Sequence, residues 1–134
     1  EKILREAVRL QPTWGQVHYS LGLLLAENPK RLPDAIRSLE RASAYWENNP
    51  RVFNNLAIAY WQSKRFEEAM RAFLQAIEQD PGNPEFIQNL LQLLTQQRKW
   101  KDALPHVRRL IELEPENTQS KELLTQIEKM AQQP

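Results

Sequence analysis

The sequence predicts an all-α protein built from pairs of antiparallel helices, and three observations lead to this prediction. Glycine is scarce, with three residues in 134, whereas leucine, alanine, glutamine, glutamate and arginine, which favour helices, dominate. Apolar residues recur at the helical spacing i, i+3, i+4 and i+7. In the stretch 52–61 these residues are Phe53, Leu56, Ala57 and Tyr60. The pattern returns after 34 residues, which indicates a repeated helical unit.

The period is clearest between residues 50–83 and 84–117. Matching residues lie 34 positions apart, as in Leu56 with Leu90, Ala69 with Ala103, and Pro81 with Pro115. The segment 15–49 follows the same pattern with one extra residue between Gly22 and Ala35. Pro50 takes the place of Pro81, and three more residues lie between Ala42 and Pro50 than between Ala76 and Pro81, an insertion in "AYWENNP". We therefore expect Tyr45 and Trp46 to extend the preceding helix by about one turn.

The first three helices are expected over 2–10, 15–27 and 33–47. Each carries apolar or small residues at helical spacing: Leu4 and Ala7; Leu21, Gly22 and Leu25; Ala35, Leu39 and Ala42. Small residues such as Gly22 allow a neighbouring helix to approach closely while larger residues fill the gaps.

Four further helices are expected over 51–63, 66–79, 84–97 and 100–113, and a final helix over 117–131. The acidic segments "EQDPGNP" and "ELEPEN" contain prolines that end one hairpin and set the start of the next. The glutamine and lysine content of the last helix suits a terminal cap with one solvated face. Either Asn117 or Thr118 could provide its N-cap.

The repeated pattern resembles the tetratricopeptide repeat family, whose 34-residue unit carries the pattern W-x2-L-G-x2-Y…A-x3-F…P. The middle unit matches best, with Phe53, Leu56, Ala57, Tyr60, Ala69, Phe73, Ala76 and Pro81. The resemblance implies helical hairpins stacked in a right-handed superhelix, or solenoid. In this single domain, residues 1–12 are the second helix of a partial repeat, 15–49, 50–83 and 84–117 are repeats, and 118–134 are the capping helix. The start within a repeat suggests a fragment of a larger protein, and the consensus-like units suggest a bacterial source.

The composition excludes several classes of partner and of chemical site. Eighteen Lys and Arg residues against seventeen Asp and Glu leave a net charge of +1, so we expect no nucleic-acid partner. No apolar run is long enough for membrane insertion, and no signal peptide is recognisable, so the compartment stays open with the cytoplasm favoured. The absence of cysteine excludes thiolate chemistry. We expect no catalytic, metal or cofactor site, because His18 is interpreted as a packing residue and His106 as solvent-facing.

The family resemblance implies that a protein or peptide partner binds the concave groove lined by the first helix of each repeat. The candidate groove residues are Tyr19, Leu23, Asn54, Asn55, Ile58, Trp61, Gln62, Gln88, Asn89 and Gln92. Helical geometry places them on the flank and back of the apolar stripe. Carboxamides can bond both the N–H and C=O groups of a peptide backbone. The placing of Asn55 and Asn89 resembles the asparagine ladder of the O-linked N-acetylglucosamine transferase family.

Alternatives are open at this point. The asparagines Asn54, Asn55 and Asn89 could instead bond only the neighbouring first helix. The chain could also be a structural domain that forms a weak homodimer through Tyr45, Trp46 or the helix 1–10, or an accessory domain of a larger enzyme. A carboxylate clamp of the kind this family uses for chaperone tails is not expected, because Tyr19 and Leu23 stand where it needs Lys and Asn.

Overall fold

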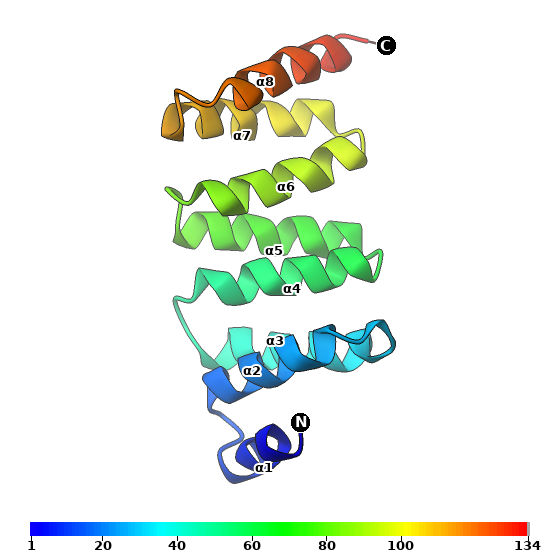
Figure 1. Ribbon diagram of the computed structural model, residues 1–134, viewed down its shortest axis with the longest axis vertical. Helices are drawn as coiled ribbons and strands as arrows, with labels where there is room; N and C mark the ends of the chain where they lie inside the picture. The colour runs from blue at the N-terminus through cyan, green and yellow to red at the C-terminus, as the bar shows by residue number, and fades with distance from the viewer. Residues whose placement is uncertain (134) are drawn as a thin grey trace. The chain divides into compact units, whose positions relative to one another are not determined.

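The computed structural model describes residues 1–133, which fold into helices joined by short turns and contain no strand (Figure 1). The all-α prediction is therefore confirmed. The chain divides into two compact units, Glu1–Gln79 and Asp80–Pro134, called here the N-terminal and C-terminal units. None of the helices within residues 1–133 has the length and apolar character needed to cross a membrane.

The N-terminal unit consists of two helical hairpins preceded by a single helix. In chain order its elements are α1 (Lys2–Leu10), α2 (Gly15–Ala26), the short 3-10 helix η1 (Pro29–Arg31), α3 (Leu32–Tyr45), α4 (Pro50–Gln62) and α5 (Phe66–Gln79). The helices α2 and α3 pack as one hairpin and α4 and α5 as the other, and α1 packs on α2.

The C-terminal unit consists of one hairpin and a final helix. Its elements are α6 (Pro84–Gln96), α7 (Trp100–Leu113) and α8 (Thr118–Ala131). The middle helix, α7, packs against both of the others. Within residues 1–133, the eight α-helices all lie within two residues of the bounds expected from the sequence.

Small residues bring the paired helices close together. A Cβ atom added to Gly22 would lie 2.7 Å from Cγ of Leu39, so only glycine fits between α2 and α3 at this point. Alanines at the matching places are fully buried: Ala35, Ala42, Ala57, Ala69, Ala76 and Ala103. Large side chains such as Phe73 and Phe86 fill the remaining space, giving a close-packed core.

Three asparagines, spaced 34 residues apart, are the N-caps of helices α4, α6 and α8. The side chain of Asn49 accepts a hydrogen bond from the amide of Arg51 at 3.2 Å. Asn83 accepts one from Glu85 at 3.0 Å, and Asn117 accepts one from Gln119 at 3.0 Å. This arrangement satisfies amides that the helix itself leaves without acceptors. It also decides between the two candidate caps of α8 in favour of Asn117.

The predicted three-residue insertion before Pro50 is wrong. Pro50 is the first residue of α4, as Pro84 is of α6, so Pro50 corresponds to Pro84 rather than to Pro81. Helix α3 ends at Tyr45, three residues after Ala42, and α5 likewise ends three residues after Ala76. The predicted extra helical turn is therefore absent, and Trp46 lies in the loop.

The single extra residue before Ala35 is accommodated in the turn between α2 and α3. This turn forms η1, where the Asn28 side chain accepts a hydrogen bond from the amide of Lys30 at 3.0 Å. The other two hairpins turn instead through left-handed residues, Lys64 with φ of 61° and Arg98 with φ of 57°. The helices on either side keep their register because the extra residue stays in the turn.

Candidate functional site

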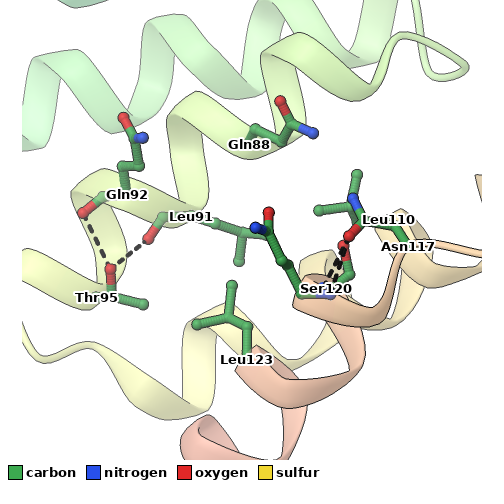
Figure 2. A pocket seen from close by; sticks show the side chains of 9 residues that line it. Gln88, Leu91, Gln92, Thr95, Leu110, Asn117, Ser120 and Leu123 are labelled. Atoms are coloured by element: carbon green, nitrogen blue, oxygen red, sulfur yellow. Dashed lines mark hydrogen bonds between the residues drawn. The ribbon is translucent and has the colours of Figure 1, made fainter. Parts of the chain in front are cut away.

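A polar cavity lies between α6 and α8 in the C-terminal unit (Figure 2). Its volume is about 380 Å³. The lining residues are Gln88, Leu91, Gln92 and Thr95 of α6, Leu110 of α7, and Asn117, Gln119, Ser120 and Leu123 at the start of α8. Figure 2 shows Leu91 and Leu123 pointing into the space between the two helices. We call this space the carboxamide cavity.

The polar groups of the carboxamide cavity differ in their availability. Thr95 donates its hydroxyl to the carbonyl of Leu91 at 2.8 Å, and Gln88 donates to the carboxylate of Glu114 at 3.3 Å. Within residues 1–133, the side-chain amides of Gln92 and Gln119 make no hydrogen bond. These two exposed amides can therefore bond a ligand without breaking a contact inside the protein.

A second cavity, called here the apolar cavity, adjoins the first. Its volume is about 490 Å³, and its lining residues are Thr95, Trp100, Leu123, Gln126, Ile127, Lys129, Met130 and Gln133. Thr95 and Leu123 line both cavities. Trp100 is half-buried, because its place at the first turn of α7 leaves one side facing this cavity.

The two cavities together form a groove with two kinds of wall, the α6–α8 groove. Among residues 1–133, no charged side chain lines the carboxamide cavity, and Lys129 is the one charged residue that lines the apolar cavity. The carboxamide cavity can therefore hydrogen-bond the uncharged amide groups of a ligand, and the apolar cavity can accept an apolar side chain. Among residues 1–133, no group of three or more His, Asp or Glu side chains gathers in a way that could hold a metal ion.

Two of the predicted groove residues of the N-terminal unit bond each other. The Asn55 side chain donates to the hydroxyl of Tyr19 at 2.7 Å, and the Tyr19 ring meets the Trp46 ring edge-on at 5.7 Å. This hydrogen bond is the kind of contact with a neighbouring first helix that the alternative interpretation requires. Asn54, expected on the exposed flank, is only 3% exposed, because the flank next to the apolar stripe is itself enclosed.

The remaining predicted residues are distributed over several places. Leu23 and Gln62 are exposed and Ile58 is half-buried. Trp61 is half-buried, with its ring edge-on to Phe73 at 6.2 Å. In the C-terminal unit, Gln88 and Gln92 come together in the carboxamide cavity, whereas half-buried Asn89 lines neither cavity.

The candidate residues chosen from the sequence omit the contribution of α8. Leu123 and Gln119 line the carboxamide cavity, and Ile127 and Met130 line the apolar cavity. The repeat register contained a signal for this contribution. Leu123 follows Asn89 by 34 residues, and Gln126 follows Gln92 by the same interval. The cap therefore supplies the wall that a further first helix would supply.

The two histidines occupy different environments. His18 is 2% exposed, and its Nε2 lies 2.6 Å from the carbonyl oxygen of Pro12, so it packs in the core as predicted. His106 was expected to face solvent but is half-buried on α7. Burial lowers the pKa of His106 below its usual value, and the nearby carboxylate of Asp102 opposes this shift.

Two family profiles, both described as Tetratricopeptide repeat, match residues 30–84 and 69–127. The chain belongs to the tetratricopeptide repeat family. Together the two profiles cover all of α3, the hairpins α4–α5 and α6–α7, and most of α8. None of the curated protein sequences matches the chain significantly.

Solved structures of other tetratricopeptide repeat proteins share this fold. MamA residues 41 to the end, from Desulfovibrio magneticus RS-1, is 23% identical with a TM-score of 0.76, and the match covers 85% of this chain and 64% of that one. YrrB, described as having an unusual peptide-binding site, is 18% identical with a TM-score of 0.73, over 92% of this chain and 63% of that one. The first repeat domain of Spaghetti (RPAP3), bound to the HSP90 peptide SRMEEVD, is 20% identical with a TM-score of 0.70. The match covers 89% of this chain and 96% of that one. This chain therefore spans less than two thirds of the MamA and YrrB chains.

Proposed function

We propose that the chain is a non-catalytic protein-interaction module that binds a peptide segment of a partner in the α6–α8 groove. The observation that carries this proposal is the pairing of two adjoining cavities, one lined by carboxamides and one by apolar side chains, around the shared residues Thr95 and Leu123. The peptide-bound RPAP3 domain and the described peptide-binding site of YrrB, both of the same fold, support a binding role.

In the proposed complex, the peptide backbone lies along the carboxamide cavity. The side-chain amides of Gln92 and Gln119 bond its N–H and C=O groups, each bond contributing a net of about 0.5–1.5 kcal/mol. These bonds hold the backbone without reading its sequence. Specificity arises in the apolar cavity, where an apolar side chain of the peptide packs among Trp100, Ile127 and Met130.

Peptides selected from a random displayed library on the purified chain provide the test. We expect the selected sequences to share one large apolar residue in a stretch of low charge, because the groove wall carries almost no charge. Calorimetric titration should give a Kd of about 1 μM, which corresponds to a binding free energy of about −8 kcal/mol. Substituting Gln92→Ala together with Gln119→Ala should weaken binding about tenfold or more.

The matched control is Gln16→Ala, which removes an exposed glutamine from a first helix, α2, far outside the α6–α8 groove in sequence. Both variants should keep the helical circular dichroism of the parent chain, because the substituted side chains are exposed and alanine favours helices. Equal affinity of the double variant and the parent chain for the selected peptides would refute the groove assignment.

A second candidate function, self-association, is favoured by the apolar surface of α1. Ile3 is 84% exposed and Leu10 is 64% exposed. At the place of Ile3, the second helices α3 and α5 have Ser38 and Ala72, both buried. A second copy of the chain covering this face would form a concentration-dependent dimer. Sedimentation should then show Ile3→Glu abolishing the dimer, and a parent chain that stays monomeric at all concentrations removes this candidate.

A further inference from the structure

A second type of cavity, rich in arginine, lies in the N-terminal unit and plays no part in the proposed peptide binding. Its volume is about 150 Å³, enough for a small group. Arg5 and Val8 of α1, His18, Leu21 and Leu25 of α2, and Asp34, Arg37, Ser38 and Arg41 of α3 line it. We call it the arginine cavity.

The charges around the arginine cavity are only partly compensated. Arg5 pairs with Glu1 at 2.6 Å, and Asp34 pairs with both Arg37 and Arg31, the latter at 3.1 Å. Arg41 has no carboxylate partner among residues 1–133. It also follows Arg37 by four residues on α3, a spacing at which like charges repel each other. An anion in the cavity would relieve this repulsion.

A buried ring nitrogen in the cavity wall lacks a partner. His18 is 2% exposed, and among the buried side-chain atoms of residues 1–133 its Nδ1 is the one without a hydrogen bond. Buried polar groups are nearly always hydrogen-bonded, so Nδ1 requires a partner from a bound group. Ser38, which is 4% exposed, lines the same cavity and can offer its hydroxyl to that group.

The tautomer of His18 defines what that group must offer. A carbonyl oxygen can only accept, so Nε2, which lies 2.6 Å from the Pro12 carbonyl oxygen, carries a proton, and in this tautomer Nδ1 is an acceptor. The guanidinium groups and the Ser38 hydroxyl are donors. A suitable ligand therefore combines negatively charged oxygens with an O–H group, as hydrogen phosphate does and sulfate does not.

We propose that the arginine cavity binds a small phosphate group, supplied either as inorganic hydrogen phosphate or as the monoanion of a phosphate monoester, both of which keep an O–H group. Arg41 and Arg37 donate charge-assisted hydrogen bonds to its oxygens, which are stronger than neutral ones. Ser38 donates a further bond, and His18 accepts the phosphate O–H at Nδ1. Arg5 contributes charge from the opposite side, on α1.

Nuclear magnetic resonance of the histidine rings tests this proposal directly, because the chain has only two histidines. Inorganic phosphate and methyl phosphate are titrated separately at a constant pH of about 6, where a large share of the methyl phosphate keeps its O–H group, and chloride keeps the ionic strength constant. We expect saturable shifts of the His18 signals and none of the His106 signals in the C-terminal unit. Saturation by inorganic phosphate alone identifies the free ion as the ligand, and saturation by methyl phosphate as well identifies the phosphate group of a monoester.

Variants connect the shift to the cavity. Arg41→Gln should raise the Kd for phosphate about tenfold, which corresponds to a loss of about 1.4 kcal/mol of binding free energy. The matched control, Arg71→Gln, removes an exposed arginine on α5 outside the cavity and should leave binding unchanged. The proposal is overturned if His18 does not respond, if sulfate shifts its signals with equal affinity, or if Arg41→Gln binds phosphate as the parent chain does. Unchanged circular dichroism of both variants verifies that each is folded.

Discussion

The side-chain amide of Asn55 donates a hydrogen bond of 2.7 Å to the hydroxyl of Tyr19, and so links the first helices α4 and α2. The Tyr19 ring also packs edge-on against Trp46 in the loop after α3. One half-buried asparagine thereby fixes three segments of the N-terminal unit. A polar residue inside an apolar helix is explained here by a partner on the neighbouring helix rather than by helix propensity.

Removing the Tyr19 hydroxyl should destabilise the N-terminal unit. Tyr19→Phe keeps the ring against Trp46 but leaves the Asn55 amide without its acceptor, so the free energy of unfolding should fall by about 0.5–1.5 kcal/mol. Urea denaturation followed by circular dichroism measures this. Tyr45→Phe is the control, because Tyr45 is exposed and its hydroxyl makes no hydrogen bond within residues 1–133. Equal stability of the two variants would contradict a stabilising role for the bond.

Gly22 and Gly82 should respond oppositely to alanine. In Gly22→Ala, the new Cβ would clash with Leu39 and force α2 and α3 apart, which should cost about 1–3 kcal/mol of stability. In Gly82→Ala, no atom of residues 1–133 that could clash lies within 4 Å of the new Cβ and φ is not positive, so stability should stay the same or rise by about 0.4–1 kcal/mol. Thermal unfolding of both variants checks this, and a Gly22→Ala protein as stable as the parent chain would show that α2 and α3 are not in such close contact.

Asn117, the N-cap of α8, should contribute more to the stability of the C-terminal unit than Thr118, the residue after it. Asn117→Ala removes the acceptor for the amide of Gln119 and should destabilise the C-terminal unit by about 0.5–2 kcal/mol. Thr118→Ala, at the first position of the helix, should have little effect because its side chain makes no capping bond. Hydrogen exchange of the first-turn amides of α8 should rise in the first variant only. The reverse order would assign the cap to Thr118.

His106 should make the stability of the chain fall at mildly acidic pH. Burial lowers its pKa in the folded state, whereas in the unfolded chain the pKa is about 6.5. The unfolded state therefore binds more protons below pH about 6.5, and stability is lost as the pH falls through this range. His106→Gln should lose less stability than the parent chain between pH 7.5 and 5.5 in urea denaturation. An identical loss in both proteins would exclude this contribution.

The helices could be predicted from the sequence because a single pattern of apolar and small residues is repeated through the chain. The failed alignment of Pro50 has a physical cause. Proline fits both the turn, where Pro81 lies, and the first position of a helix, where Pro50 and Pro84 lie. Residue type alone does not separate these two places, whereas the helix bounds do.

The candidate site was predicted less completely than the fold. Gln88 and Gln92 could be chosen because their repeat positions face away from the apolar stripe. The burial of Asn54 and the half-exposure of Trp100 depend on how neighbouring helices pack, which helical spacing within one helix does not contain. The wall supplied by Leu123 and Met130 was missed because α8 was interpreted as a cap.

The absence of cysteine allows the central claim, peptide binding in the α6–α8 groove, to be tested at a single introduced thiol. Gln92→Cys places that thiol in the carboxamide cavity, and Gln16→Cys places one on the exposed surface of α2. The measurement is the rate of thiol modification by a maleimide, with and without a saturating peptide from the library selection. We predict that the peptide slows modification at position 92 about tenfold or more and leaves position 16 unchanged, since a bound backbone covers the first thiol only. Equal rates at position 92 with and without the bound peptide would contradict the account.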